Sequence, residues 1–233
     1  MKNYVIINGV NSGTITGLAI KELPPITKPM IRSQIEEIDG RDGDIITELG
    51  YAAYDKQIEI GLYGAFDINR VIEFFTGEGK VTFSNESDKF YYYKIINQID
   101  YEKLLKFKTA VVTFHCQPFK YPTTESTINL TTGNNTITNS GNIYAKPILE
   151  IVGSGNIEIG LGGVQILEIA LGTNEKITID VPNLEAYNTD DKSLMNRDVT
   201  GDYMKLLIQK GNNTLSITGT ITSAKIKNYT RWI

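Results

Sequence analysis

The sequence contains one histidine and one cysteine, and the two are adjacent: His115 and Cys116. A thiol with an imidazole beside it could work as a nucleophile with its general base. Both residues lie, however, in an alternating run, residues 109–119, which predicts a β-strand whose successive side chains point to opposite faces. We therefore expect Cys116 to pack in the core and His115 to be hydrogen-bonded or half-exposed, without a catalytic pair.

Carboxylates are the other candidates for chemistry. Asp39, Asp42 and Asp44 are clustered, but an EF-hand would need Asp or Asn at the positions that hold Arg41 and Gly43. A second group of acidic residues could hold calcium if its loop brought them together: Asp190, Asp191, Asp198 and Asp202. We interpret both groups as loop carboxylates that face water, and we expect no metal ligands.

The glycine-rich segments lack the setting that phosphate binding requires. Residues 153–156 and 160–163 lie between predicted strands, whereas a phosphate-cradling loop leads into the N-terminus of a helix. The sequence has no Gly-x-Ser-x-Gly nucleophile elbow. We expect no catalytic residue, no cofactor-binding residue and no cofactor, and we predict that the protein is not an enzyme.

The composition is that of a globular protein with no nucleic-acid-binding arm. The 233 residues are 41% hydrophobic and 21% charged, with a net charge of −4. Residues 1–120 and 121–233 are each at −2, so neither half has the basic character that holds DNA. The first apolar stretch is too short for a signal peptide, and no run approaches the roughly 20 residues of a membrane helix. No membrane insertion is expected.

One helix is predicted in the first half of the chain, over residues 68–76. Asp67 is a suitable N-cap, and Gly77 supplies a left-handed stop. The apolar residues between them recur at helical spacing: Ile68, Val71, Ile72 and Phe75. The helix should cover one face of a sheet.

A hairpin is predicted directly after this helix. Its strands, residues 80–84 and 89–96, flank a polar turn at residues 85–88. The second strand contains three consecutive tyrosines, which cannot all face the core. We expect Tyr92 to point inward, with its two tyrosine neighbours outside.

A second hairpin is predicted within residues 31–49. Glycine accepts the positive φ of a two-residue type I′ turn, which places the turn at Asp42-Gly43. The flanking strands are rich in charge and lack a continuous apolar face. Two interpretations remain open: an ordinary surface hairpin, or an arm that docks on a partner.

The second half of the chain reads as a β-sandwich or jelly roll. Residues 123–142 are rich in Ser, Thr and Asn, and short strands separated by Gly or Asn follow them. Gly133-Asn134-Asn135-Thr136 recurs at residues 211–214, each time before an alternating strand, which a tight turn explains. Both halves are therefore predicted to be mainly β, with one short helix in the first.

In this order of elements the chain resembles the distal tail protein (Dit) family of long-tailed, non-contractile phages and prophages. In the first half the resemblance rests on these segments: residues 7–9, 39–44, 68–76, 79–83, 91–93 and 112–119. In the second half it rests on the following: residues 147–151, 177–180, 201–206 and 211–215. The order of these turn and strand signatures carries the resemblance.

The resemblance implies a mainly β fold with two β-sandwich domains: a ring-forming N-terminal domain with one short helix, residues 1–122, and a galectin-like or jelly-roll C-terminal domain, residues 123–233. Six copies would form a homo-hexameric ring that joins the distal end of the tail tube to the baseplate or tail-tip complex and lets DNA pass during ejection. The tip of the charged hairpin would contact a neighbouring subunit: Arg41, Asp42, Gly43 and Asp44.

The same resemblance implies partners and a location. The partners would be the major tail tube protein, the tail-associated hub protein and other baseplate or receptor-binding proteins, with DNA only in transit. The protein would lie at the distal tail tip of the virion, after assembly in the cytoplasm of the bacterial host.

A carbohydrate-binding module for host cell-surface glycans is the alternative function, because the second half reads as a lectin-like sandwich. Sugar sites usually offer exposed aromatic platforms. The large aromatic residues of this half are few: Tyr144, Tyr187, Tyr203, Tyr229 and Trp232.

Overall fold

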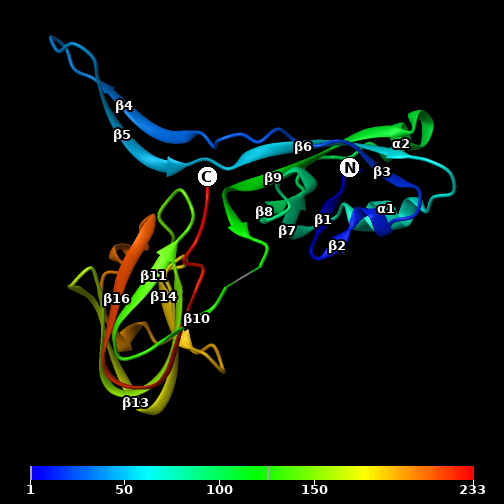
Figure 1. The fold of residues 1–233 in the computed structure, drawn as a ribbon. Coiled ribbons are helices and arrows are strands. Elements are labelled where there is room, and N and C mark those ends of the chain that lie inside the picture. The colour runs from blue at the N-terminus through cyan, green and yellow to red at the C-terminus, as the bar shows by residue number, and fades with distance from the viewer. Residues whose placement is uncertain (1, 125) are drawn as a thin grey trace. The chain divides into compact units, whose positions relative to one another are not determined.

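The computed structural model describes residues 2–124 and 126–233, and strands dominate it (Figure 1). The chain divides into two units: the first runs to Thr123 and includes Ile233, and the second is Thr124–Trp232. Each unit has its own hydrophobic core. The expected fold class, mainly β, is confirmed.

The first unit is built on a seven-stranded antiparallel sheet in the order β2-β1-β7-β8-β9-β6-β3. Its strands are β1 (Val5–Ile7), β2 (Val10–Asn11), β3 (Leu18–Glu22), β6 (Tyr54–Leu62), β7 (Glu78–Phe83), β8 (Lys89–Lys94) and β9 (Thr109–Pro122). The sheet encloses a core that includes Ile60, Val112 and Phe114, all fully buried. Two further strands, β4 (Ile31–Glu37) and β5 (Asp44–Tyr51), form a separate two-stranded sheet.

The predicted helix is confirmed as α1 (Ile68–Phe74). The Asp67 carboxylate accepts hydrogen bonds from the backbone N–H groups of Asn69 and Arg70, and Gly77 has φ 95°. Val71 and Phe74 are buried against the sheet core. The N-cap and the apolar spacing thus identify this helix correctly.

A second helix, α2 (Tyr101–Phe107), corrects the expectation of one helix in this unit. Asp100 caps it by accepting a hydrogen bond from the N–H of Lys103, and Lys108 ends it at φ 59°. Only Leu104 is fully buried, while Leu105 and Phe107 are exposed. The helix therefore has no apolar stripe and no terminal glycine, which are the two signals that revealed α1.

The tyrosine triplet of β8 is oriented opposite to the prediction. Tyr91 and Tyr93 are buried in the core, whereas Tyr92 is exposed. Tyr91 packs edge-on against Phe83, with the ring centres 5.9 Å apart. Tyr93 packs edge-on against Phe114, with the ring centres 5.2 Å apart. The tyrosines do alternate between the two faces of the sheet, as predicted, but the opposite set faces the core. Aromatic rings on other strands decide which face of β8 is buried.

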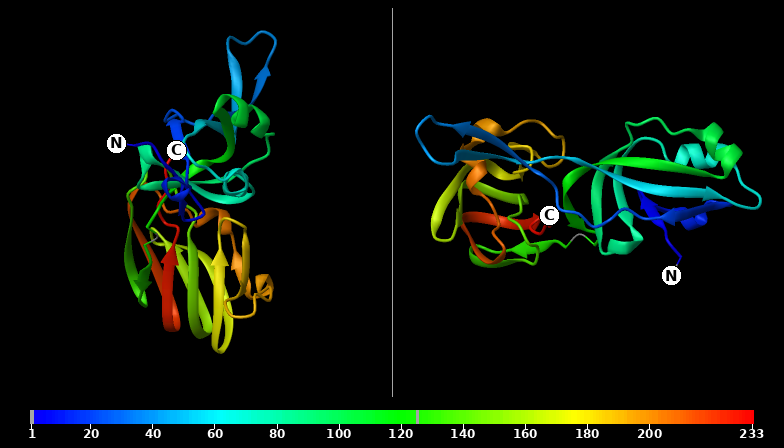
Figure 2. Two further views of the ribbon diagram at one scale, coloured as in Figure 1. Left: turned by 90° about the vertical axis from the view of Figure 1, so that its right-hand side faces the viewer. Right: turned by 90° about the horizontal axis from the view of Figure 1, so that it is seen from above.

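The second unit is a two-layer sandwich made largely from three long strands that serve both layers (Figure 2). Its strands are β10 (Ile128–Leu130), β11 (Gly133–Asn139), β12 (Ile148–Leu161), β13 (Val164–Asp180), β14 (Glu185–Asn188), β15 (Val199–Gly201) and β16 (Gly211–Lys227). One layer contains β10, β14 and one half of each long strand. The other contains β11, β15 and the remaining halves.

The long strands correct the expectation of many short strands separated by turns. Register shifts interrupt the β12–β13 ladder between Gly153 and Gly155, and the β12–β16 ladder between Ser154 and Glu158. Bulges of this kind bend a strand and let it pass from one layer to the other. Gly153 and Gly155 therefore mark a bend within the continuous strand β12, whereas Gly162 and Gly163 do form the turn between β12 and β13.

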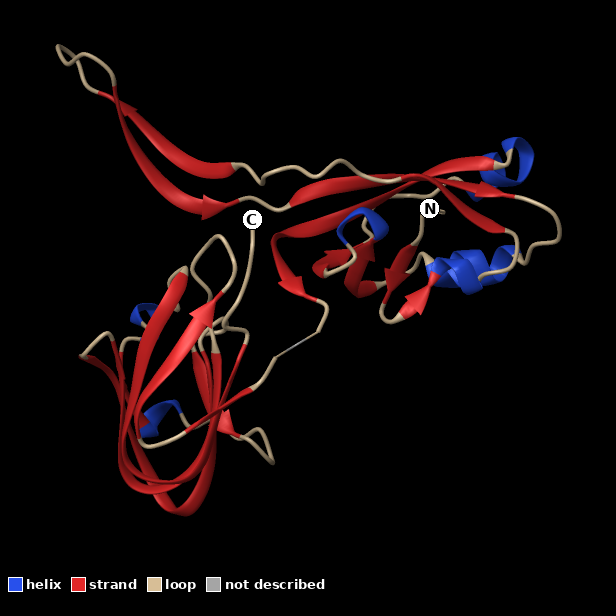
Figure 3. Cartoon of the chain, viewed as in Figure 1, coloured by secondary structure: helices blue, strands red, loops and turns tan. Residues whose placement is uncertain are grey.

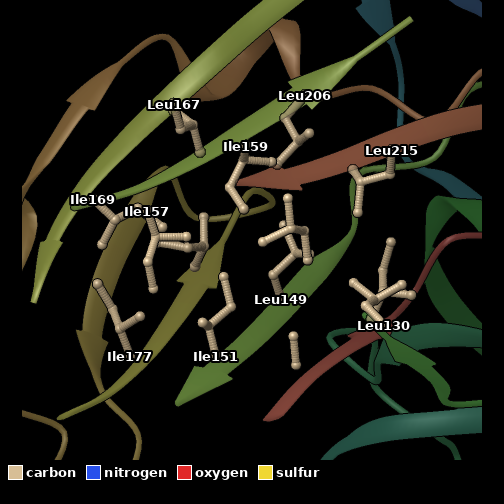
Figure 4. Packing of buried hydrophobic residues seen from close by; sticks show 14 of the residues in the cluster. Leu130, Leu149, Ile151, Ile157, Ile159, Leu167, Ile169, Ile177, Leu206 and Leu215 are labelled. Carbon is tan, nitrogen blue, oxygen red and sulfur yellow. The ribbon is translucent and has the colours of Figure 1, made fainter. Parts of the chain in front are cut away.

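The core between the two layers is aliphatic (Figure 4). Ile151 and Ile177, which face one another in one layer, and Ile157 and Ile169 in the other are fully buried. Alternate residues along both halves of β12 point into this space, which is why the sequence alternates on both sides of the bend.

Candidate functional site: the exposed β4–β5 hairpin

The hairpin formed by β4 and β5 projects beyond the sheet of its own unit (Figure 3). Within the described residues, these two strands pair only with each other, from Ile31 opposite Tyr51 to Glu37 opposite Asp44. An isolated two-stranded hairpin is marginally stable in water unless its side chains find another surface. The hairpin is therefore a candidate contact element.

The tip of the hairpin gathers the four predicted interface residues. Arg41, Asp42 and Gly43 lie in the loop, and Asp44 is the first residue of β5, all of them exposed. The expected two-residue type I′ turn at Asp42-Gly43 is wrong. The connection is a six-residue loop, residues 38–43, because Asp42 does not have the positive φ that this turn needs. Gly43 has it, at 77°.

Among the described residues, the charged side chains of the hairpin bond only within it: Arg32 donates to the carbonyl oxygen of Leu49, and Glu36 accepts a hydrogen bond from Gln34. Residues 31–51 contain six acidic and two basic side chains, and none of them forms an ion pair with any residue that the structure describes. Large apolar side chains are exposed beside them: Met30, Ile35, Ile38, Ile46 and Leu49. Acidic and apolar groups mixed in this way suit a surface that another protein covers.

The segment that leads into the hairpin, which we call its incoming leg, precedes β4 and contains Pro24 and Pro25. It is anchored by two side chains of the first unit. Lys56 donates a 2.9 Å hydrogen bond to the carbonyl oxygen of Pro25, and Asn85 donates one of 2.9 Å to that of Pro24. The Lys56 ammonium also lies 4.9 Å from the centre of the Tyr91 ring. Burial lowers the pKa of Lys56 below its ordinary value. This anchor could not be predicted from the sequence, since a lysine in a strand is ordinarily an exposed residue.

The outgoing leg is anchored by aromatic packing. The ring of Tyr51, at the end of β5, packs edge-on against Phe119 at 5.5 Å. Three residues later β6 joins the main sheet, where Tyr54 pairs with Cys116. Both legs are therefore held at their root, while the tip has contacts only within the hairpin.

His115 and Cys116 do not form a catalytic pair, as expected. Cys116 is fully buried, and burial raises the pKa of its thiol to about 12. His115 is half-exposed, and its Nδ1 lies 2.8 Å from Oδ1 of Asp55 on the neighbouring strand. A thiol that stays protonated in the core is not a nucleophile at neutral pH.

The aspartates of the second unit serve local structure. Asp190 pairs with Lys176 at 2.8 Å, Asp191 accepts hydrogen bonds from Ser193, and Asp202 caps the 3₁₀ turn Tyr203–Lys205. In the described ranges, no three His, Cys, Asp or Glu side chains lie close enough to hold a metal ion together. The two clusters that the sequence suggested are not brought together as ligands.

The aromatic side chains of the second unit offer no exposed platform within the described residues. The five residues considered for sugar stacking are all half-buried: Tyr144, Tyr187, Tyr203, Tyr229 and Trp232. The first unit has a pocket of about 140 Å³ beside Asn3 and Ser12. Ligand sites usually measure roughly 300–1,000 Å³. None of the helices described is both long enough and apolar enough to cross a membrane.

The fold is similar to that of a phage Dit protein and of a phage baseplate protein, while comparison of the sequence with family models and curated proteins finds no match. No protein-family model matches the chain, and no curated protein matches it. The Dit protein of phage SPP1 (gp 19.1), described as a paradigm of the hub adsorption apparatus in phages infecting Gram-positive bacteria, has a similar structure. The TM-score is 0.72 at 18% identity, over 100% of both chains.

A second solved structure with this fold comes from the baseplate of phage p2 in its activated conformation with Sr. The TM-score is 0.51 at 9% identity, over 97% of this chain and 96% of that chain. Identities this low show a common fold. The resemblance found in the sequence is thus confirmed at the level of the Dit fold, which spans both units.

Proposed function

We propose that this protein is a structural component of a phage tail tip, in which six copies form a ring. The ring would connect the distal end of the tail tube to the baseplate and leave a channel for DNA during ejection. The observation that carries the proposal is the full-length structural match to SPP1 Dit, with a TM-score of 0.72 over 100% of both chains. A fold by itself implies function only by analogy, so the chain must also carry a surface that could make the ring contact.

The β4–β5 hairpin provides such a surface. A closed cyclic ring needs two complementary surfaces on every copy, one that reaches out and one that receives. The β4–β5 hairpin reaches out, is held at its root, and presents exposed apolar side chains beside charges that form no ion pair with any described residue. Arg41, Asp42, Gly43 and Asp44 would then contact a neighbouring copy.

The proposal also covers the location and the partners. The ring would lie at the distal tail tip of the virion, after assembly in the host cytoplasm. It would contact the major tail tube protein on one side, and the tail-associated hub protein with other baseplate proteins on the other. A net charge of −4 suits a conduit, because DNA passes most easily through a channel that does not bind it. The role requires no catalysis.

Electron microscopy of the purified, negatively stained protein tests this function. Class averages should show closed rings with six-fold symmetry and a central opening. Single particles of one chain, without rotational symmetry at any concentration that can be imaged, would contradict the ring. Glycan binding by the second unit would then be the next activity to measure.

A further inference from the structure

Helix α2 exposes a basic and apolar surface that nothing in its own unit covers. Lys103, Lys106 and Phe107 have the i, i+3, i+4 spacing that places side chains on one helix face, beside the face that buries Leu104. Phe107 is 61% exposed. We call these three exposed residues the α2 surface: Lys103, Lys106 and Phe107.

The lysines of the α2 surface are available for a partner. Neither Lys103 nor Lys106 forms an ion pair with a residue in the described part of the chain. The Lys106 ammonium lies 5.4 Å from the centre of the Phe107 ring, so charge and apolar area adjoin. An exposed phenylalanine next to two lysines fits a partner that offers apolar side chains flanked by carboxylates.

One face of the hairpin has this chemistry. Residues directly opposite each other in an antiparallel pair share a face, and so do residues two positions apart. Ile35 faces Ile46, with the pair Glu37 and Asp44 on the side of the tip and Glu48 on the side of the root. Both isoleucines are exposed, at 57% and 63%. We call this set the hairpin face: Ile35, Glu37, Asp44, Ile46 and Glu48.

The two surfaces lie at opposite ends of the first unit, as Figure 3 shows. Strand β6 starts at Tyr54, next to the root of the hairpin, and its Gly61 pairs with Thr109, two residues after α2 ends. The run from Tyr54 to Gly61 spans about 23 Å at ~3.3 Å per residue. The hairpin also extends away from α2, so the two surfaces of one copy do not meet.

We propose that the hairpin face of one copy docks on the α2 surface of a second copy. This inference rests on the proposed ring and names the receiving surface in it. The two isoleucines contact Phe107, and the carboxylates of the hairpin face lie against Lys103 and Lys106. Surfaces at opposite ends of one unit produce a head-to-tail contact, which closes into a ring when the rotation between copies allows it.

Two charge-reversal variants test the contact. The α2 variant carries Lys103→Glu and Lys106→Glu, and the hairpin variant carries Glu37→Lys and Asp44→Lys. Like charges across the interface should raise the apparent dissociation constant of either variant at least about tenfold. Light scattering gives the mass, and circular dichroism checks that each variant is folded. The matched control reverses two exposed lysines of the second unit, Lys205→Glu with Lys210→Glu, and should assemble like the wild type.

Mixing the two variants gives the sharpest result. Each copy of one variant then has a complementary surface only on the other, so an equimolar mixture should restore a ring of alternating copies. A ring of six, being even-numbered, can close in this way. Loss of assembly in both variants without recovery on mixing would overturn direct docking.

The same experiment separates this inference from the proposed ring. If the wild type forms rings and both variants do so as readily as the control, the docking proposal is wrong and the ring stands. If the wild type is a single chain at every concentration, the ring itself is wrong.

Discussion

The Lys120 ammonium lies 2.9 Å from Oε1 of Glu86, and the two side chains are only 6% and 11% exposed. The other carboxylate oxygen of Glu86 accepts a 2.7 Å hydrogen bond from the Tyr91 hydroxyl. Burial, together with this hydrogen bond, raises the pKa of Tyr91 well above its ordinary value. This buried polar cluster of Lys120, Glu86 and Tyr91 lies next to Lys56, the residue that anchors the root of the hairpin.

We predict that Lys120→Met lowers the free energy of unfolding by about 3 kcal/mol, because it leaves the Glu86 carboxylate buried without its cation. The double variant Lys120→Met with Glu86→Gln should lose less, since no unpaired charge remains. Urea denaturation of both variants measures the difference. A double variant that is less stable than the single one would show that the pair is not what stabilises this part of the core.

The second prediction concerns alkaline pH. The folded pKa of Cys116, about 12, lies above the ordinary value of 9.0, so the folded chain holds this proton where the unfolded chain releases it. The protonated Cys116 thiol therefore contributes to the free energy of unfolding. This contribution is present in full below pH 9 and is lost as pH rises from 9 towards 12. The stability advantage of the wild type over Cys116→Ala should fall by roughly 2 kcal/mol between pH 8 and pH 11. Urea titrations at the two pH values measure it, and a constant difference would refute it.

The third prediction concerns the anchor of the incoming leg. Lys56→Met keeps the apolar stem but removes the hydrogen bond to Pro25 O. Limited proteolysis within residues 23–30 should become faster, while β6 and β9 stay resistant. Lys21→Met, which removes an exposed ion pair with Glu59 instead, is the matched control. An unchanged cleavage rate in residues 23–30 would mean that Lys56 does not hold this leg.

The fourth prediction concerns the repeated Gly-Asn-Asn-Thr motif. In each copy the second asparagine binds the backbone four residues earlier: Asn135 binds N–H and C=O of Thr131, and Asn213 binds those of Gln209. Asn135→Ala should cost roughly 1–2 kcal/mol, because it leaves backbone groups without partners. Asn134→Ala changes the exposed neighbour and should cost under 0.5 kcal/mol. Thermal denaturation of the two variants compares them, and equal losses would contradict the role of Asn135.

Local chemistry predicted part of this structure well. The Asp67 cap and the separation of His115 from Cys116 each depend on neighbouring residues alone, and both are confirmed. The motif of Asn135 also acts locally, as a turn before a strand, although its hydrogen bonds were not foreseen.

Features that depend on distant residues were not predictable. The phase of the tyrosine triplet depends on Phe83 and Phe114 across the sheet. The anchor at Lys56 needs a proline carbonyl 31 residues earlier in the chain. Helix α2 was missed because it shows Leu105 and Phe107 to solvent, so the periodic pattern of a packed helix is absent.

The mass of the wild-type protein in solution, measured by light scattering across a range of concentrations, tests the central claim most directly. One chain has a mass of 26.0 kDa, so the ring predicts a species of about 156 kDa, six times that value. Replacing residues 32–50, most of the hairpin, with a short glycine linker should return the mass to that of one chain. A wild-type mass of 26.0 kDa at every concentration would contradict a ring that this chain builds by itself.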